Sequence, residues 1–247
     1  MTVTAERIKL QTTRSPLWTS LAVVVVSLGF AAIQALTALP FSAIPPERAA
    51  IGVATFGVPV LMMLSALTIT SEHRTGLIRT TFMATPRRVR VLGAKALVCA
   101  VFSGILAAIM TAGSIALVRA MATGQQGEKL SLTLPSVWRT VGAISLYAVL
   151  GAVLAVGLGA LVRHSAAVVA ILVLLPFVVE PLLGATPRIG ARIGPLFPFA
   201  NASTFTEVPW LQTFTMWWGP VGAALYFASI AAAVFVMAAV VVSRRDP

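Results

Sequence analysis

The sequence predicts an all-α, polytopic membrane protein with six transmembrane helices, and three observations lead to this fold class. Hydrophobic residues make up 58% of the 247 residues and charged residues only 10%, whereas soluble domains are about 45–50% apolar and about 25% charged. The mean hydropathy is +0.95. Six apolar segments also follow one another along the chain, each close to the roughly 20 residues that cross a bilayer as a helix.

Each expected span is an apolar run between polar or proline-rich segments. The first would be about 34 Å long as a helix, enough for a hydrocarbon core of about 30 Å. Pro59 predicts a kink in the second span, and Pro176 and Pro181 interrupt the fifth. The spans are expected at residues 17–39, 49–70, 91–118, 137–162, 166–183 and 220–242. They leave no room for a separate soluble domain, so residues 1–247 form a single transmembrane domain.

The basic residues predict the orientation of the chain. With the N-terminus inside, 12 of the 18 Lys and Arg residues fall on the inner side and 6 on the outer side. Because Lys and Arg accumulate in cytoplasmic loops, both termini are expected in the cytoplasm. The net charge of +11 is therefore assigned to membrane topology and not to nucleic-acid binding. The Ala-, Val- and Arg-rich composition suggests a GC-rich bacterial genome, and the expected location is a bacterial inner (plasma) membrane.

Two segments outside the spans have their own patterns. Residues 1–16 carry Arg7, Lys9 and Arg14, which predicts a short interfacial helix on the inner leaflet, with a disordered tail as the alternative. Residues 185–219 combine several prolines with aromatic residues. This segment is too apolar for a solvated loop and too interrupted for a span, so we expect a re-entrant hairpin on the outer side.

The sequence contains no catalytic or cofactor-binding motif of the common kinds. It has no GxxxxGK[ST] phosphate loop, no HExxH and no GxSxG. Its histidines, His73 and His164, have no nucleophile or metal partner near them in sequence, and Cys99 is the single cysteine. We therefore expect a chain that is not an enzyme by itself and that binds no metal or cofactor.

The most informative segment is the basic loop between the second and third spans, expected at residues 71–90. It begins with Glu72, His73 and Arg74, and it ends with the Thr-Pro-Arg-Arg sequence before the third span. Between them, a short stretch places apolar residues on one side of a two-turn helix. A loop that only anchors the chain needs the arginines but no such helix, so the pattern predicts a contact of the helix-in-groove kind with a cytoplasmic partner.

This segment resembles a known family. The string Glu-His-Arg-Thr-Gly-Leu-Ile-Arg-Thr-Thr from Glu72, followed by Thr-Pro-Arg-Arg and by an Ala-Lys pair that ends at Lys95, is similar to the loop after span 2 in permease subunits of type-2 ABC exporters. His73 stands where related permeases often have Tyr. Residues 196–202 also resemble the outer segment of that family. The resemblance implies six spans, an N-terminal interfacial helix and a re-entrant hairpin between spans 5 and 6.

The resemblance also implies partners and roles. Two permease subunits, either two copies or two paralogues, would pair in the lipid bilayer, and two cytoplasmic ABC ATPase subunits would bind ATP and Mg. Residues 75–83 would form the coupling helix in a groove of the ATPase, with Arg79 facing acidic groups. The implied coupling residues are Glu72, Arg74, Thr75, Gly76, Leu77, Ile78, Arg79, Thr80 and Phe82.

Candidates for a substrate pathway are fewer. An acid inside a span is a functional hypothesis by default, and Glu180 is such an acid, although contact with water or with Arg188 would also explain it. Apolar or amide side chains in the first two spans complete the set of Phe30, Gln34, Phe56, Met62 and Glu180.

We therefore expect the membrane subunit of an ATP-driven efflux system that exports a hydrophobic or amphipathic compound, such as a drug, an antibiotic or a lipid. The alternative is a scaffold or assembly factor that docks a cytoplasmic partner through residues 71–90 without transport. A membrane-embedded enzyme is the least favoured reading, because the sequence lacks a constellation of acid, base, nucleophile or metal ligands.

Overall fold

The computed structural model describes residue 4 and residues 15–39, 41–75, 88–209, 211 and 213–244. Within these ranges every regular element is a helix, and six helices are long and apolar enough to cross a membrane. The prediction of an all-α polytopic fold is confirmed. The expected interfacial helix at residues 1–16 falls almost entirely outside the described residues.

The six spans lie close to their expected positions, and two of them are composite. The second joins a π-helical turn to an α-helix, and the fifth contains a π-helical turn between two α-helices. In chain order the spans are α2 (Ser15–Thr37), η1 (Val53–Gly57) with α4 (Val58–Thr75), α6 (Arg88–Met121), α7 (Pro135–Val162), α8 (Ser165–Leu174) with η3 (Leu175–Val179) and α9 (Glu180–Gly184), and α12 (Pro220–Arg244).

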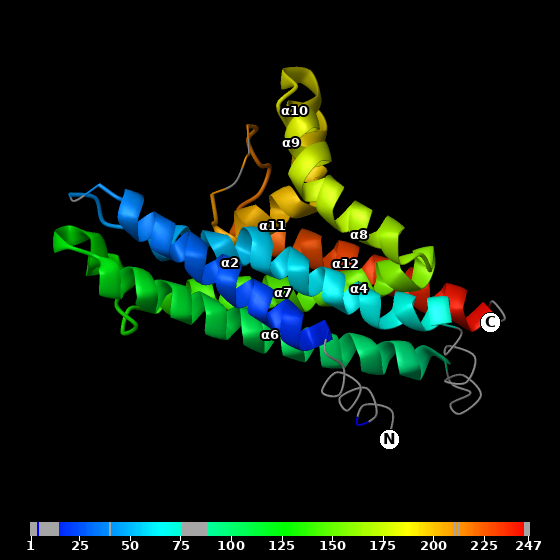
Figure 1. The fold of residues 1–247 in the computed structure, drawn as a ribbon. Coiled ribbons are helices and arrows are strands. Elements are labelled where there is room, and N and C mark those ends of the chain that lie inside the picture. Colours follow the sequence, from blue (N-terminus) through cyan, green and yellow to red (C-terminus); the bar gives the residue numbers. More distant parts are fainter. Residues whose placement is uncertain are drawn as a thin grey trace.

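The helices on either side of the predicted loop at residues 71–90 are longer than the sequence predicted. Helix α4 continues to Thr75, and α6 begins at Arg88, so both flanking helices extend into the stretch expected as loop. In Figure 1 the start of α2, the end of α4, the start of α6 and the end of α12 lie at one end of the bundle. We call this the loop end and the opposite one the far end.

The prolines inside spans accompany π-helical turns and do not break the helices. A proline lacks an N–H group, and its ring collides with the preceding turn of an α-helix. In η1 the N–H of Val58 donates to Val53, directly before Pro59. In η3, which contains Pro176, the N–H of Glu180 donates to Leu175. The wider π turn accommodates the ring, so the helix continues where the sequence suggested an interruption.

Helix α7 is the centre of the bundle and packs against α4, α6 and α12 (Figure 1). Its contact with α4 depends on small residues, as expected for a packing seam. A Cβ atom at Gly151 would lie 3.0 Å from the side chain of Met62, and one at Gly159 would lie 2.6 Å from Ile69 and 3.0 Å from the carbonyl oxygen of Ala66. The two backbones therefore approach more closely than larger side chains would permit.

The segment between spans 5 and 6 turns back on itself. It contains α10 (Pro187–Ile193), η4 (Gly194–Leu196) and α11 (Pro198–Thr206). A Cβ atom at Gly190 would lie 2.2 Å from the carbonyl oxygen of Gly184, so α10 folds back onto α9. In Figure 1 these two helices project from the bundle, and α11 returns to pack on α12. Two short helices, α3 (Pro46–Ala49) and η2 (Gly124–Leu130), lie in the other far-end connections.

The close seam between α4 and α7 generates the first prediction. Gly159→Ala should lower the free energy of unfolding by about 1–3 kcal/mol, because the new methyl group meets backbone as well as side chain. Gly142→Ala in the same helix is the control, since nothing lies within 4 Å of its Cβ position; it should be neutral or stabilising by up to about 1 kcal/mol. Denaturation in mixed detergent micelles measures both. Equal losses in the two variants would contradict the seam.

Candidate functional site

A buried ion pair joins the two helices that flank the loop of residues 76–87. The Nζ atom of Lys95 lies 2.8 Å from Oε1 of Glu72. The side chains are 1% and 9% exposed, respectively. Lys95 also approaches the carbonyl oxygen of Thr68 at 3.5 Å. The pair therefore connects the end of α4 to the second turn of α6 inside the bundle.

The burial of this pair makes it sensitive to the loss of either partner. A buried charge is tolerated because its counter-charge and hydrogen bonds replace water, and removal of one partner leaves the other charge uncompensated. Cys99 lies one turn further along α6, where its sulfur is 3.8 Å from the hydroxyl of Thr68. These contacts fix α4 and α6 relative to one another at the loop end, so both ends of the loop start from one rigid base.

The structure describes only part of the predicted coupling set. Glu72 is buried in the ion pair, the side chain of Arg74 is exposed, and α4 ends at Thr75. Sequence reasoning gave Glu72 a role in holding the coupling helix but did not identify Lys95 as its partner; a lysine within an apolar run was the available signal. The remaining members lie outside the described residues: Gly76, Leu77, Ile78, Arg79, Thr80 and Phe82.

Two of the predicted pathway residues belong to a row of aromatic rings. The ring centroids of Phe30 on α2 and Phe56 on η1 are 4.7 Å apart. Phe56 in turn stacks on Phe177 of η3 at 5.7 Å. The row joins spans 1, 2 and 5, and all three rings are half-buried. The sequence did not single out Phe177, because nothing in its local pattern relates it to the second span.

The other two uncharged candidates have different surroundings. Met62 is fully buried in the core, where it faces Gly151. Gln34 is half-buried on α2. A role of these residues in transport stays a prediction.

Glu180 caps the N-terminus of α11, a role that the sequence did not predict. Its side chain accepts hydrogen bonds from the backbone N–H groups of Phe199 at 3.0 Å and Ala200 at 2.8 Å, and the residue is buried. The first N–H groups of a helix have no partner within the helix, and a carboxylate also interacts favourably with the positive end of the helix dipole. Glu180 thereby attaches the re-entrant segment to span 5.

Asn201 secures the same segment from the other side. Its side-chain amide donates to the carbonyl oxygens of Pro195 at 2.9 Å and Phe197 at 2.8 Å, and it accepts from the indole of Trp218 at 2.7 Å. The residue is fully buried, so the Asn-Ala-Ser sequence at this position is a structural element and not an accessible glycosylation site.

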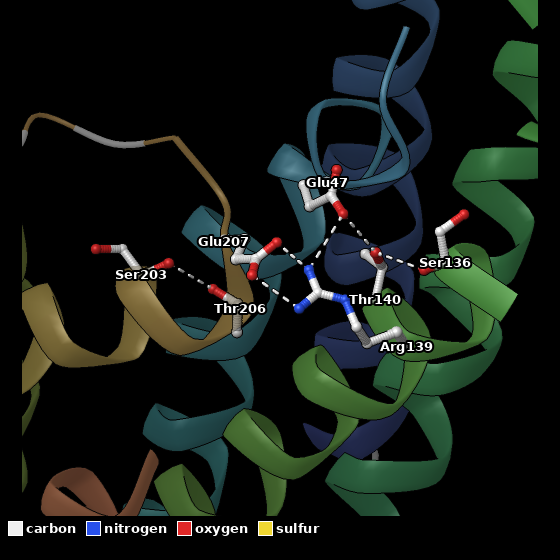
Figure 2. Close-up of polar contacts among 7 residues, drawn as sticks. All are labelled: Glu47, Ser136, Arg139, Thr140, Ser203, Thr206 and Glu207. Carbon is white, nitrogen blue, oxygen red and sulfur yellow. Dashed lines mark hydrogen bonds and ion pairs between the residues drawn. The ribbon is translucent and has the colours of Figure 1, made fainter. Parts of the chain in front are cut away.

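A second group of charged residues lies at the far end (Figure 2). Arg139 of α7 bonds to both carboxylate oxygens of Glu207, one at 2.7 Å, and lies 3.6 Å from Glu47. Thr140 donates to Glu47 at 3.1 Å. We call Glu47, Arg139, Thr140 and Glu207 the far-end polar cluster. It joins the connection after span 1, the start of span 4 and the end of α11.

The described residues offer little for metal or nucleophilic chemistry. They contain no group of three His, Cys, Asp or Glu residues that could hold a metal ion. His164 accepts a hydrogen bond from the N–H of Ala167 and so caps α8. The buried charges instead connect helices.

Comparison with protein-family models gives no match, and comparison with curated proteins gives none either.

The ion pair of α4 and α6 generates the second prediction. Lys95→Met should lower the free energy of unfolding by about 3–5 kcal/mol, because the buried Glu72 carboxylate loses the ammonium group 2.8 Å away. The double variant Glu72→Gln with Lys95→Met should recover most of this loss, since neither side chain then carries a charge. The measurement is denaturation in mixed micelles, with Lys129→Met on exposed η2 as the control. A double variant no more stable than the single one would refute the pairing.

The cap of α11 generates the third prediction. Glu180→Gln should lower the free energy of unfolding by about 1–3 kcal/mol, because an amide presents only one acceptor oxygen to the two N–H groups. Hydrogen exchange should become faster at the amides of Phe199 and Ala200, which gives a local readout. Glu128→Gln, on an exposed side chain of η2, should change neither quantity. Unchanged exchange at both amides would show that the cap does not hold α11.

Proposed function

We propose that the chain is the transmembrane subunit of an ABC exporter, which moves a hydrophobic or amphipathic compound outward with energy from a separate ATPase subunit. The observation that carries the proposal is the segment from Glu72 to Lys95. Its sequence resembles the coupling loop of type-2 ABC permeases, and its two ends are held together by a buried ion pair. A loop that must transmit force needs such a rigid base.

The arrangement of the spans supports a path for that force. The ATPase pair closes on ATP and presses on the coupling helix. Because the Glu72–Lys95 pair joins α4 to α6, the displacement moves both helices together. Helix α4 contacts α7 and α8 along its length, so the motion reaches spans 4 and 5. Spans 2 and 5 meet through Phe56 and Phe177, which favours a pathway for apolar substrates beside these rings.

The proposed setting is a bacterial inner membrane with both termini in the cytoplasm. Six spans place the start of α2 and the end of α12 at the loop end, and the excess of Lys and Arg residues on that side favours the cytoplasm. A second permease subunit completes the pathway, and ATP and Mg belong to the ATPase subunit.

The fourth prediction concerns the partner. We expect the tagged chain, purified in mild detergent, to retain a Walker-motif ATPase that mass spectrometry identifies. Arg79→Asp and Phe82→Asp should each reduce the recovered ATPase at least about 10-fold, because a charge at a well-packed contact commonly costs more than 1.4 kcal/mol. Arg188→Asp, an exposed residue of α10, is the matched control and should retain the ATPase.

Two outcomes would reject the exporter. If the parent chain carries no ATPase, or only a protein without ATPase motifs, the scaffold function becomes the better account. If all three variants retain the ATPase equally, the contact is not made by the loop between spans 2 and 3. Membrane insertion and the size-exclusion profile are measured for each variant. They distinguish a variant that has lost the ATPase contact from one that has not folded.

A further inference from the structure

A small pocket lies between spans 2, 4 and 5 and the re-entrant helix α11. Its volume is about 40 Å³, and its lining residues come from η1 and the following turn, α7, η3, α11 and the residues after it; they include Thr55, Tyr147, Phe177, Ser203, Thr206 and Val208. A buried water needs about 10–15 Å³, whereas pockets for whole drug-sized ligands have about 300–1,000 Å³. The space fits one polar group of a larger molecule.

Tyr147 makes this pocket chemically specific. Its ring is buried and fixed edge-on by Phe205 and Phe227, with centroids 6.1 and 5.6 Å away. Its hydroxyl group forms no hydrogen bond with any residue that the structure describes. A hydroxyl group without a partner inside the protein can bind a ligand oxygen, and a tyrosine whose ring is held rigidly beside a pocket is suited to do so.

The backbone around the pocket supports the same inference. Both π-helical turns of the described residues, η1 and η3, contribute to its wall, and such turns occur frequently at functional sites. The far-end wall includes Thr206 and Val208, on either side of Glu207, whose carboxylate is held by Arg139. Two independent features, the shape of the spans and the far-end polar cluster, therefore fix the pocket.

The lining residues determine the class of ligand. None of them is charged, and an ion without a counter-charge is costly to bury. Thr55 adds a hydroxyl group to that of Tyr147, whereas Ser203 and Thr206 donate theirs to carbonyl oxygens of α11 and offer a ligand only acceptor oxygens. Span 5, which lines the pocket through Pro176 and Phe177, also exposes Leu174, Val178 and Leu182 on successive turns, and these offer an apolar surface to a hydrocarbon chain.

We propose that this pocket binds the polar head of a neutral amphiphile, such as a long-chain alcohol, with the Tyr147 hydroxyl as its hydrogen-bond partner. The hydrocarbon tail lies along the exposed side of span 5. Transport of the amphiphile by this chain rests on the proposed function. Binding of the amphiphile in the pocket does not depend on it.

The fifth prediction tests binding with the purified chain in lipid nanodiscs, without any ATPase. The probe is 3-azioctanol, a photoreactive neutral alcohol, and 3-azioctane, which lacks the hydroxyl group, serves as the reference probe. Mass spectrometry should find alcohol adducts on η3 and α11 that unlabelled octanol displaces. Tyr147→Phe should reduce these adducts about 5-fold, the effect of one lost hydrogen bond, and Thr55→Val should reduce them less.

The sequence provides a matched control, because its only other tyrosine is Tyr226. Tyr226 donates to the carbonyl oxygen of Leu196 and does not line the pocket, so Tyr226→Phe should leave the labelling unchanged. Equal labelling of the parent and Tyr147→Phe, or an adduct pattern that the hydrocarbon probe reproduces, would overturn the proposal. Labelling without a co-purifying ATPase would reject the exporter and retain the binding site. A co-purifying ATPase without labelling would retain the exporter and reject the binding site.

Discussion

The fold depends on one constraint: inside a bilayer, every backbone N–H and C=O group must find its partner within the protein. Water is absent there, and an unpaired group costs several kcal/mol, about 2–7 on common scales. Continuous helices meet this constraint directly. Pro59 and Pro176 violate it locally, and the π-helical turns η1 and η3 accompany these violations. The irregular geometry of spans 2 and 5 is thus part of a helical solution and not an interruption of it.

Charges inside the bundle obey the same constraint in a stronger form. Glu72 is paired with Lys95 near the loop end, and Glu180 accepts hydrogen bonds from two backbone N–H groups of α11. Each contact joins segments that are distant in sequence, so each also determines tertiary structure. At the far end, the half-exposed side chain of Arg139 bonds to Glu207 and lies near Glu47, where partial access to water makes such pairs individually weak. The buried contacts of Glu72 and Glu180 therefore determine the tertiary structure more strongly than the half-exposed ion pairs of Arg139.

The sequence predicted the features that depend on local pattern. Apolar runs of sufficient length located all six spans. Contacts between distant segments could not be predicted in this way. The partner of Glu180 is a helix N-terminus about twenty residues later, and the position of Tyr147 beside α11 depends on how the re-entrant segment folds back. The sequence contains no periodicity that encodes either contact.

Helix α4 combines these features in a way that bears on how a signal could cross the bundle. It is joined to α6 by a buried ion pair at the loop end and lies tightly against α7 at Gly159 and Gly151. Packed helices transmit displacement because they have little room to deform. At its far end, α4 continues into η1, where the hydrogen bonding is irregular and the wall of the pocket begins. A displacement of the loop would therefore travel along a stiff helix and be absorbed where that helix is least regular, beside Thr55 and Phe56. This geometry gives a physical reason for the π turn of span 2 to lie at the pocket and not elsewhere along the span.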